Sequence, residues 1–168
     1  MITEANKFAA LVVDDNAHMR VIVVTLLHAL GVGEAKQASD GAEARTLLTE
    51  WRPDLIVIDQ NMRPVCGTEF TRALRRAPDT CFDTPIIMLT AHTERGMVVA
   101  ARDAGIDEIL AKPISAKALM QRLHAVTHER RGFVRTADYI GPDRRRRASS
   151  DYAGPKRRDT DSGTYSLE

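Results

Sequence analysis

The chain has 168 residues, 43% of them apolar, and a formal net charge of +1 at pH 7. This length suits one packed domain with an appendage. No apolar run approaches membrane-spanning length, and the amino terminus has no charged-then-apolar signal pattern, so we expect a cytoplasmic protein without membrane insertion. Cys66 and Cys81 lack metal-ligand spacing and are expected to be reduced structural thiols.

Short apolar runs alternate five times with segments of helical period. The apolar runs are rich in β-branched residues, as in strands buried on both faces, and predict strands at 8–13, 34–37, 55–58, 86–89 and 108–110. The intervening periodicity predicts helices at 17–30, 41–51, 67–77, 93–103 and 115–128. Candidate caps and stops support these bounds: Asn16, Asp40, Ser115, Gly31 and Gly105. Five β-α units predict an α/β fold with a parallel sheet and helices on both faces.

The periodicity ends after His128, and Gly, Pro, Ser, Asp and Arg dominate the rest of the chain. We therefore expect a folded domain at 7–128 and an intrinsically disordered tail at 129–168. Residues 130–158 carry ten Lys and Arg against three Asp, a net charge of +7, whereas the rest of the chain carries a net charge of −6. A basic arm on an acidic domain favours binding of a polyanion or an anionic small molecule.

Polar residues follow four of the five predicted strands. Asp14 and Asp15 follow the first strand, Asp59 the third, Thr90 the fourth and Lys112 the fifth. These side chains should converge, because the carboxyl ends of parallel strands share one edge of the sheet. Three crowded carboxylates need a cation, and oxygen ligands with room for water suit Mg²⁺.

Four segments in this order resemble the receiver domain of two-component response regulators, of CheY-like size: LVVDDN (11–16), LIVIDQNM (55–62), MLTA (88–91) and AKPI (111–114). The resemblance implies a five-stranded, doubly wound, flavodoxin-like fold. It implies that Asp59 takes a phosphoryl group from a sensor histidine kinase and that Thr90 and Lys112 contact the phosphoryl oxygens. It also implies a set of Mg²⁺ ligands, with Asp14 acting through water: Asp14, Asp15, Asp59 and the Asn61 carbonyl. Such a reaction needs little more than a carboxylate, a metal and charge-stabilising contacts. The alternative is a vestigial acidic rim that is never phosphorylated.

The sequence departs from the family pattern at three places. Arg63 stands before Pro64 where the family often has proline directly, and Cys66 stands where Asp is common. Ile109, three residues before Lys112, replaces the Tyr or Phe that usually reports phosphorylation in this family. We therefore expect the output face, formed by the fourth helix, fifth strand and fifth helix, to respond weakly to phosphorylation alone.

The tail contains one phrase twice, thirteen residues apart: DYIGPDRR at 138–145 and DYAGPKRR at 151–158. We expect Gly-Pro in each copy to form a tight bend that presents Tyr and the Arg pair. Arginine matches the O6/N7 edge of guanine and phosphate oxygens, Tyr and Arg stack on purines, and Asp can accept from the donor edge of guanine. Two copies suggest a ligand with two equivalent halves, which favours cyclic di-GMP. The expected ligand-binding residues are Arg135, Asp138, Tyr139, Arg144, Arg145, Arg147, Asp151, Tyr152, Arg157 and Arg158.

This arrangement resembles the arginine-rich extension of CheY-like effectors that bind cyclic di-GMP and tune the flagellar motor. The resulting hypothesis is a regulator, not an enzyme, in which phosphorylation and cyclic di-GMP jointly control docking on a partner such as the motor switch. The open alternatives are a phosphoryl shuttle between histidine proteins, a tail that binds an acidic protein surface, and a nucleic-acid arm. The nucleic-acid arm is disfavoured because Asp138, Asp143 and Asp151 would repel a polyphosphate.

Overall fold

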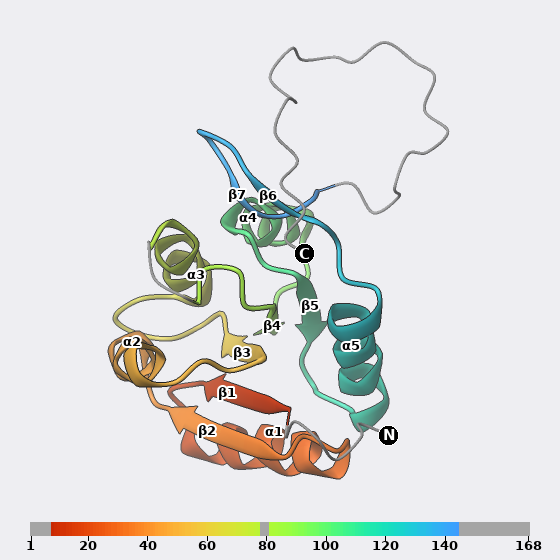
Figure 1. Cartoon of the computed structure of the whole chain (residues 1–168). Coiled ribbons are helices and arrows are strands. Elements are labelled where there is room, and N and C mark those ends of the chain that lie inside the picture. The colour runs from red at the N-terminus through yellow and green to blue at the C-terminus, as the bar shows by residue number, and fades with distance from the viewer. Residues whose placement is uncertain (1–7, 78–80, 145–168) are drawn as a thin grey trace.

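The computed structural model of the protein describes residues 8–77 and 81–144. In this part of the chain five parallel strands form one sheet in the order β2-β1-β3-β4-β5 (Figure 1). The strands are β1 (Ala9–Val13), β2 (Glu34–Ala38), β3 (Leu55–Asp59), β4 (Ile86–Thr90) and β5 (Glu108–Ala111). All five predicted strands are confirmed, and each bound agrees to within a residue.

Each strand is followed by a helix, as the periodicity predicted: α1 (Ala17–Ala29), α2 (Gly41–Glu50), α3 (Gly67–Arg76), α4 (Arg95–Ala104) and α5 (Ala116–His128). The capping predictions are confirmed, since the side chains of Asn16, Asp40 and Ser115 accept hydrogen bonds from amides of the first turns. Gly105 ends α4 with a φ of 92°, a left-handed conformation that favours glycine. No helix in the described ranges is long and apolar enough to cross a bilayer.

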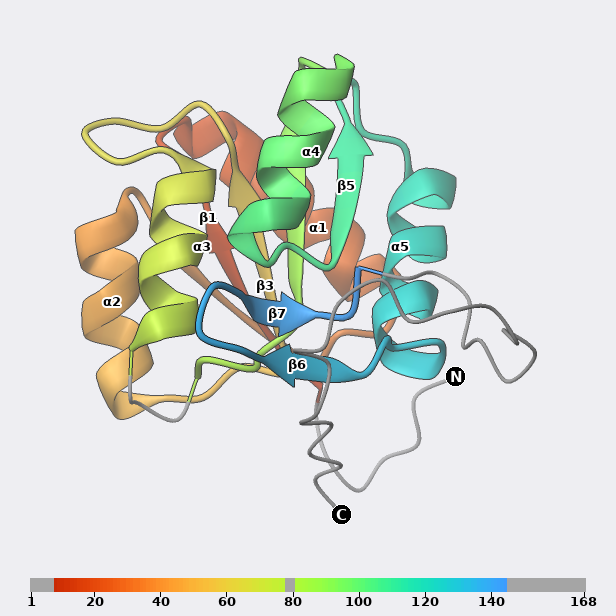
Figure 2. The ribbon, with the colours of Figure 1, turned by 90° about the horizontal axis from the view of Figure 1, so that it is seen from above.

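The helices cover both faces of the sheet (Figure 2). On one face α2, α3 and α4 pack over alternate strand residues such as Leu11 and Ile58. On the other face α1 and α5 pack over the intervening residues, such as Val12 and Leu89. Because both faces are buried, the central strands are apolar at nearly every position, and burial of this surface at about 25 cal/mol per Å² dominates the stability of the fold.

The first part of the tail departs from the prediction. Residues expected to be disordered form an antiparallel hairpin of β6 (Phe133–Arg135) and β7 (Ile140–Pro142). Figure 2 shows this hairpin beside the ends of α3 and α4, at the edge of the sheet where β5 begins. The prediction of disorder is therefore wrong for the hairpin, because this polar segment gains contacts from the domain that its own composition cannot supply. The remainder of the predicted tail, 145–168, lies outside the described residues.

Candidate functional site

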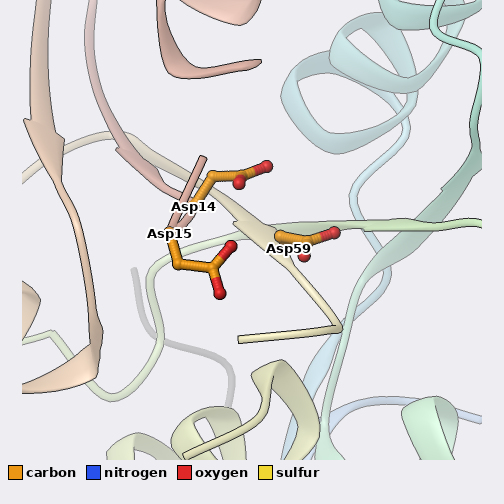
Figure 3. Close-up of side chains that lie close together, drawn as sticks. All are labelled: Asp14, Asp15 and Asp59. Carbon is orange, nitrogen blue, oxygen red and sulfur yellow. The ribbon is translucent and has the colours of Figure 1, made fainter. Parts of the chain in front are cut away.

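Three carboxylates meet at the carboxyl ends of β1 and β3, next to the point where the strand order reverses. One oxygen from each of Asp14, Asp15 and Asp59 lies within 4.8 Å of the others (Figure 3). Asp14 and Asp59 are buried and Asp15 is exposed. The predicted convergence is confirmed for this set, and the arrangement concentrates negative charge on one side of a partly dry pocket.

Backbone contacts hold the two buried carboxylates in place. The amide of Asn16 donates to Asp14 Oδ1 at 2.8 Å, and the amide of Asn61 donates to Asp59 Oδ2 at 3.0 Å. The Arg20 guanidinium donates to the Asp14 carbonyl at 2.7 Å, which ties α1 to the end of β1. Each carboxylate therefore keeps one oxygen bonded to the backbone and turns the other toward the pocket.

Lys112 supplies the positive charge of the pocket. Its Nζ lies 2.7 Å from Asp59 Oδ1 and 3.5 Å from Asp14 Oδ2. Burial alone would lower the pKa of Lys112, but the hydrogen bond and charge of Asp59, together with the charge of Asp14, raise it above its ordinary value. Lys112 is therefore protonated, and its charge partly neutralises the cluster.

Asp14 is left with an unsatisfied oxygen. Its Oδ2 is buried without a hydrogen-bond partner, because Lys112 is close enough for charge attraction but not placed for a hydrogen bond. Burial raises the pKa of Asp14, and the opposing contributions of the Asn16 amide and Lys112 are smaller. A buried oxygen without a hydrogen-bond partner, beside two more carboxylates, forms a set of ligands that fits a hard divalent cation such as Mg²⁺.

Thr90 lies at the carboxyl end of β4, beside the pocket, but its hydroxyl forms hydrogen bonds with the backbone of His92. The buried side chain donates to the His92 carbonyl at 3.1 Å and accepts from the His92 amide at 3.0 Å. The Lys112 amide donates to the Thr90 carbonyl at 2.8 Å, so the ends of β4 and β5 are joined here. Thr90 and Lys112 are therefore neighbours, and Thr90 anchors the loop that leads to α4.

Two features that the sequence analysis missed place α3 against Asp59. A Cβ on Gly67 would lie 2.6 Å from the Asp59 carbonyl oxygen, so only glycine permits this approach. Gln60 accepts from the Thr68 amide at 3.1 Å, which fixes the start of α3. Glycine at the predicted start of a helix was the signal that could have revealed the close approach.

The first copy of the repeated phrase lies in the hairpin, but not with the predicted geometry. Gly141 and Pro142 belong to β7, and the turn is formed instead at 136–139, where the Thr136 amide donates to the Tyr139 carbonyl at 2.8 Å. The prediction of a Gly-Pro bend is therefore wrong for the first copy, and the second copy, at 151–158, lies outside the described residues. Tyr139 provides the reason, because its hydroxyl donates to the Pro142 carbonyl at 2.7 Å and keeps this stretch extended beside the ring.

Four of the predicted ligand-binding residues can be placed. The Arg144 guanidinium lies 4.0 Å from the centre of the Tyr139 ring and 3.6 Å from a carboxylate oxygen of Asp103 on α4. Arg135 lies 5.8 Å from the Phe82 ring, and Asp138 is exposed in the turn. The others lie outside the described residues: Arg145, Arg147, Asp151, Tyr152, Arg157 and Arg158. The acidic pocket lies at the carboxyl ends of the strands and the hairpin lies near their amino ends (Figure 2), so the two predicted sites are separate.

The fold and the acidic pocket are those of a receiver domain, and comparison with known proteins agrees. The chain belongs to the family described as response regulator receiver domain, whose model matches residues 10–124. The match therefore ends before β6, and the hairpin lies outside it.

Several relatives are chemotaxis proteins. The chain is 33% identical to the chemotaxis protein CheY of Pseudomonas aeruginosa over 116 residues, which are 69% of this chain and 93% of that protein. It is 34% identical to the phosphate regulon transcriptional regulatory protein PhoB of the same organism, covering 69% of this chain and 50% of that protein. The solved structure of the Vibrio cholerae chemotaxis protein CheY4 superposes with a TM-score of 0.67 at 32% identity, covering 72% of this chain and 99% of that chain.

Proposed function

We propose that Asp59 accepts a phosphoryl group from the phosphohistidine of a sensor histidine kinase in the cytoplasm. The observation that carries this proposal is the contact of 2.7 Å between Lys112 Nζ and Asp59 Oδ1, in a pocket where Asp14 keeps an unsatisfied oxygen. An Asp59 oxygen attacks phosphorus in line, the P–O bond forms, and the P–N bond breaks to leave neutral imidazole once a proton is supplied. Lys112 stabilises the charge on the transferred group, and the Thr90 hydroxyl contacts it after exchanging its bonds to His92.

The residues that would hold Mg²⁺ in this reaction are Asp14, Asp15, Asp59 and the Asn61 carbonyl, with Asp14 acting through water. Bound there, the ion would neutralise the carboxylates and stabilise negative charge on the phosphoryl group. Lys112 lies 2.7 Å from an oxygen of Asp59 and 3.5 Å from an oxygen of Asp14, so it neutralises part of the charge of the cluster itself.

Amide-shift mapping with Mg²⁺ and either an acyl phosphate or beryllofluoride tests this assignment. We expect shifts around Asp59, Thr90 and Lys112, and we expect Asp59→Asn to abolish them. Asp15→Asn should sharply weaken Mg²⁺ binding. Asp103→Asn, at the opposite edge of the sheet, is the matched control and should leave the response intact. A wild-type chain that gives no shift would have a vestigial pocket.

We further propose that the two copies of the tail phrase bind cyclic di-GMP. Support comes from the first copy, which presents an arginine and a tyrosine ring close together, the side-chain types that contact the edge and the face of a purine. Exposed Asp138 in the same turn offers acceptors for the guanine donor edge.

Calorimetry distinguishes this ligand from its competitors. Replacing Arg144 and Arg145 together, or Arg157 and Arg158 together, by Ala should each cost at least about 2 kcal/mol, because each change removes charge-assisted contacts. Arg95→Ala on α4 has no place in the proposed site and controls for one lost positive charge. Cyclic di-AMP should bind much more weakly, and the salt dependence should be shallow, whereas a nucleic-acid arm would show a steep one.

The output we propose is docking on a partner, with the flagellar motor switch as the leading candidate, and no catalysis on a separate substrate. The chemotaxis relatives support this choice, and so do exposed apolar side chains on α4 and α5: Val98, Val99 and Met120. Ile109 lies between these helices and packs against the core, where it replaces the usual aromatic reporter. Binding of a motor-switch peptide should change with cyclic di-GMP in the full chain and should not change in a chain ending at Glu129.

A further inference from the structure

The hairpin is anchored on the receiver by an aromatic side chain. Phe133 packs edge-to-face with Phe82, with ring centres 5.7 Å apart, and its ring lies 5.4 Å from the Arg75 guanidinium. Arg75 is 2% exposed and is held by Asp107 at 2.9 Å and by the Gly105 carbonyl at 3.0 Å. The anchor therefore meets a rigid part of the domain, where α3 and the start of β5 are joined.

Two glycines bring the hairpin backbone against the end of α4. A Cβ on Gly141 would lie 2.7 Å from the Gly105 Cα, and a Cβ on Gly105 would lie 2.7 Å from the Ile140 carbonyl oxygen. The ring of Tyr139 lies over the same glycine, because a Cβ on Gly141 would also lie 2.7 Å from the Tyr139 hydroxyl. Glycine in the first copy thus serves contact with the receiver and not a bend.

The side chains that would contact a guanine, Arg144 and Tyr139, already contact other groups of the protein when the hairpin is docked. Arg144 covers the Tyr139 ring at 4.0 Å and pairs with Asp103 on α4, while the Tyr139 hydroxyl is bonded to Pro142. A purine that stacks on Tyr139 needs the ring face that Arg144 covers. A bidentate contact from Arg144 to a guanine edge or a phosphate likewise requires the guanidinium to leave Asp103.

The two copies differ at the anchor. The second copy repeats the tyrosine, glycine, proline and arginine as Tyr152, Gly154, Pro155 and Arg157, but the residue thirteen positions after Phe133 is Arg146. An arginine in place of the Phe133 ring would bring a second cation next to buried Arg75. The sequence therefore equips only the first copy for docking on the receiver.

We propose that the first copy is an intramolecular docking segment that competes with cyclic di-GMP. When the first copy is docked on the surface formed by α3, α4 and the start of β5, it is not available to the ligand. Ligand binding breaks the pair between Arg144 and Asp103 and releases the hairpin. This inference rests on the proposed binding of cyclic di-GMP. Linkage makes this competition reciprocal: docking of the hairpin lowers the affinity for the ligand, and bound ligand weakens docking by the same factor. Contacts that hold the hairpin on the receiver therefore lower the affinity for the ligand.

Variants that loosen the anchor test the competition in the full chain. Phe82→Ala changes only the receiver side and Phe133→Ala only the hairpin side, and neither residue belongs to the proposed ligand site. Each variant should bind cyclic di-GMP at least about threefold more tightly than the wild type, the factor expected for losing one aromatic pair from the competing state. Trp51→Ala removes a partly buried aromatic residue whose ring lies 4.5 Å from Lys36 on β2, and it should leave the affinity unchanged.

Amide hydrogen exchange provides a second readout. Saturating cyclic di-GMP should increase exchange in the hairpin amides, such as that of Asp143, which donates to the Gly132 carbonyl at 2.7 Å. The beryllofluoride response at Asp59 confirms that each variant is folded, and Gly141→Ala offers another route to release if an aromatic variant fails to fold.

The outcomes separate the two proposals. Unchanged or weaker affinity in both anchor variants, with a wild type that binds, overturns the competition and leaves ligand binding by the tail in place. If the anchor variants bind cyclic di-GMP and the wild type does not, the competition is supported, because docking then suppresses binding completely in the wild type. If neither the wild type nor any released variant binds cyclic di-GMP, the proposed ligand is wrong and the competition falls with it.

Discussion

At the scale of single residues, the acidic pocket contains contacts that lower the stability of the fold. Asp14, Asp15 and Asp59 repel one another, and Asp14 keeps an oxygen that no protein group satisfies. The sequence predicted this set correctly, because four strand ends carried polar residues in register with one edge of the sheet. It could not predict the local hydroxyl bonds of Thr90 or the unsatisfied oxygen, since both depend on side-chain orientations fixed only by packing.

Replacing Asp14 should stabilise the protein without metal. The pKa of Asp14 in the folded protein is raised above its ordinary value of 3.8, mainly by burial. Between the two pKa values the folded protein binds more protons than the unfolded chain, so stability falls as pH rises through that window, and the cost persists at pH 7. Asp14→Asn should therefore raise the free energy of unfolding at pH 7 in EDTA by about 1 kcal/mol.

Urea denaturation across pH measures this effect. The advantage of Asp14→Asn should disappear below the ordinary pKa of 3.8, where the wild-type carboxyl is protonated in both states. Exposed Asp15→Asn is the control and should show a smaller gain. An Asp14→Asn chain that is less stable than the wild type at pH 7 would contradict the account of an unsatisfied charge.

The contact between Gly67 and Asp59 makes a second prediction for a single residue. In Gly67→Ala the new Cβ meets a backbone oxygen at 2.6 Å, so α3 must shift, and we expect a loss of at least about 2 kcal/mol and a weaker beryllofluoride response. Gly96→Ala is the matched control in α4, because nothing lies within 4 Å of its Cβ position. It should stabilise by up to about 1 kcal/mol, and thermal unfolding distinguishes the two variants.

At the scale of elements, hydrophobic periodicity and capping residues predicted the five β-α units. They did not predict the hairpin and the buried arginine that join these units near the amino ends of β4 and β5. Caps at Asn16, Asp40 and Ser115 and the stop at Gly105 reproduced the helix bounds closely. The hairpin was missed because its strands are only three residues long and their partner surface comes from other elements. The buried arginine of α3 was also missed, although a charged residue on the buried face of a predicted helix was a visible signal.

Arg75 joins α3 to the segments that precede β4 and β5 and to the hairpin, so its loss should be costly. Its guanidinium donates to Asp107 and to the carbonyls of Phe82, Thr84 and Gly105. Arg75→Met leaves the Asp107 carboxylate buried without its partner, and we expect a loss of about 3–5 kcal/mol at pH 7. Because burial already raises the pKa of Asp107, the loss should shrink as pH falls and the carboxyl becomes protonated.

A matched surface change separates this effect from general sensitivity to lost charge. Arg102→Ala removes an exposed ion pair with Asp103 on α4 and should change stability by no more than about 0.5 kcal/mol. Chemical denaturation at pH 7 and pH 5 measures both variants. A loss for Arg75→Met no larger than that for Arg102→Ala would mean that the pair does not organise this edge.

At the scale of the whole molecule, the folded unit extends beyond the receiver that the family defines. The family match ends at residue 124, whereas ordered contacts continue through Arg144, which pairs with Asp103. The acidic pocket and the hairpin lie at opposite ends of the same strands, and α4 runs between them, from the loop held by Thr90 to Gly105 against the hairpin (Figure 2). The same helix therefore contacts the loop beside the pocket at one end and the hairpin at the other.

Two truncations test whether the hairpin belongs to the folded unit. A chain ending at Glu129 loses the Phe133 anchor and the bonds from Arg131 to the Asp107 and Asp143 carbonyls, and it exposes the surface around Arg75. Burial of one aromatic side chain is worth about 1.5–3 kcal/mol, so we expect a loss of about 2 kcal/mol in urea denaturation. A chain ending at Arg144 keeps every one of these contacts and should match the full chain. Both should retain the beryllofluoride response at Asp59, because the pocket is built from β1, β3, β4 and β5. Equal stability of all three chains would show that the hairpin contributes nothing to the receiver.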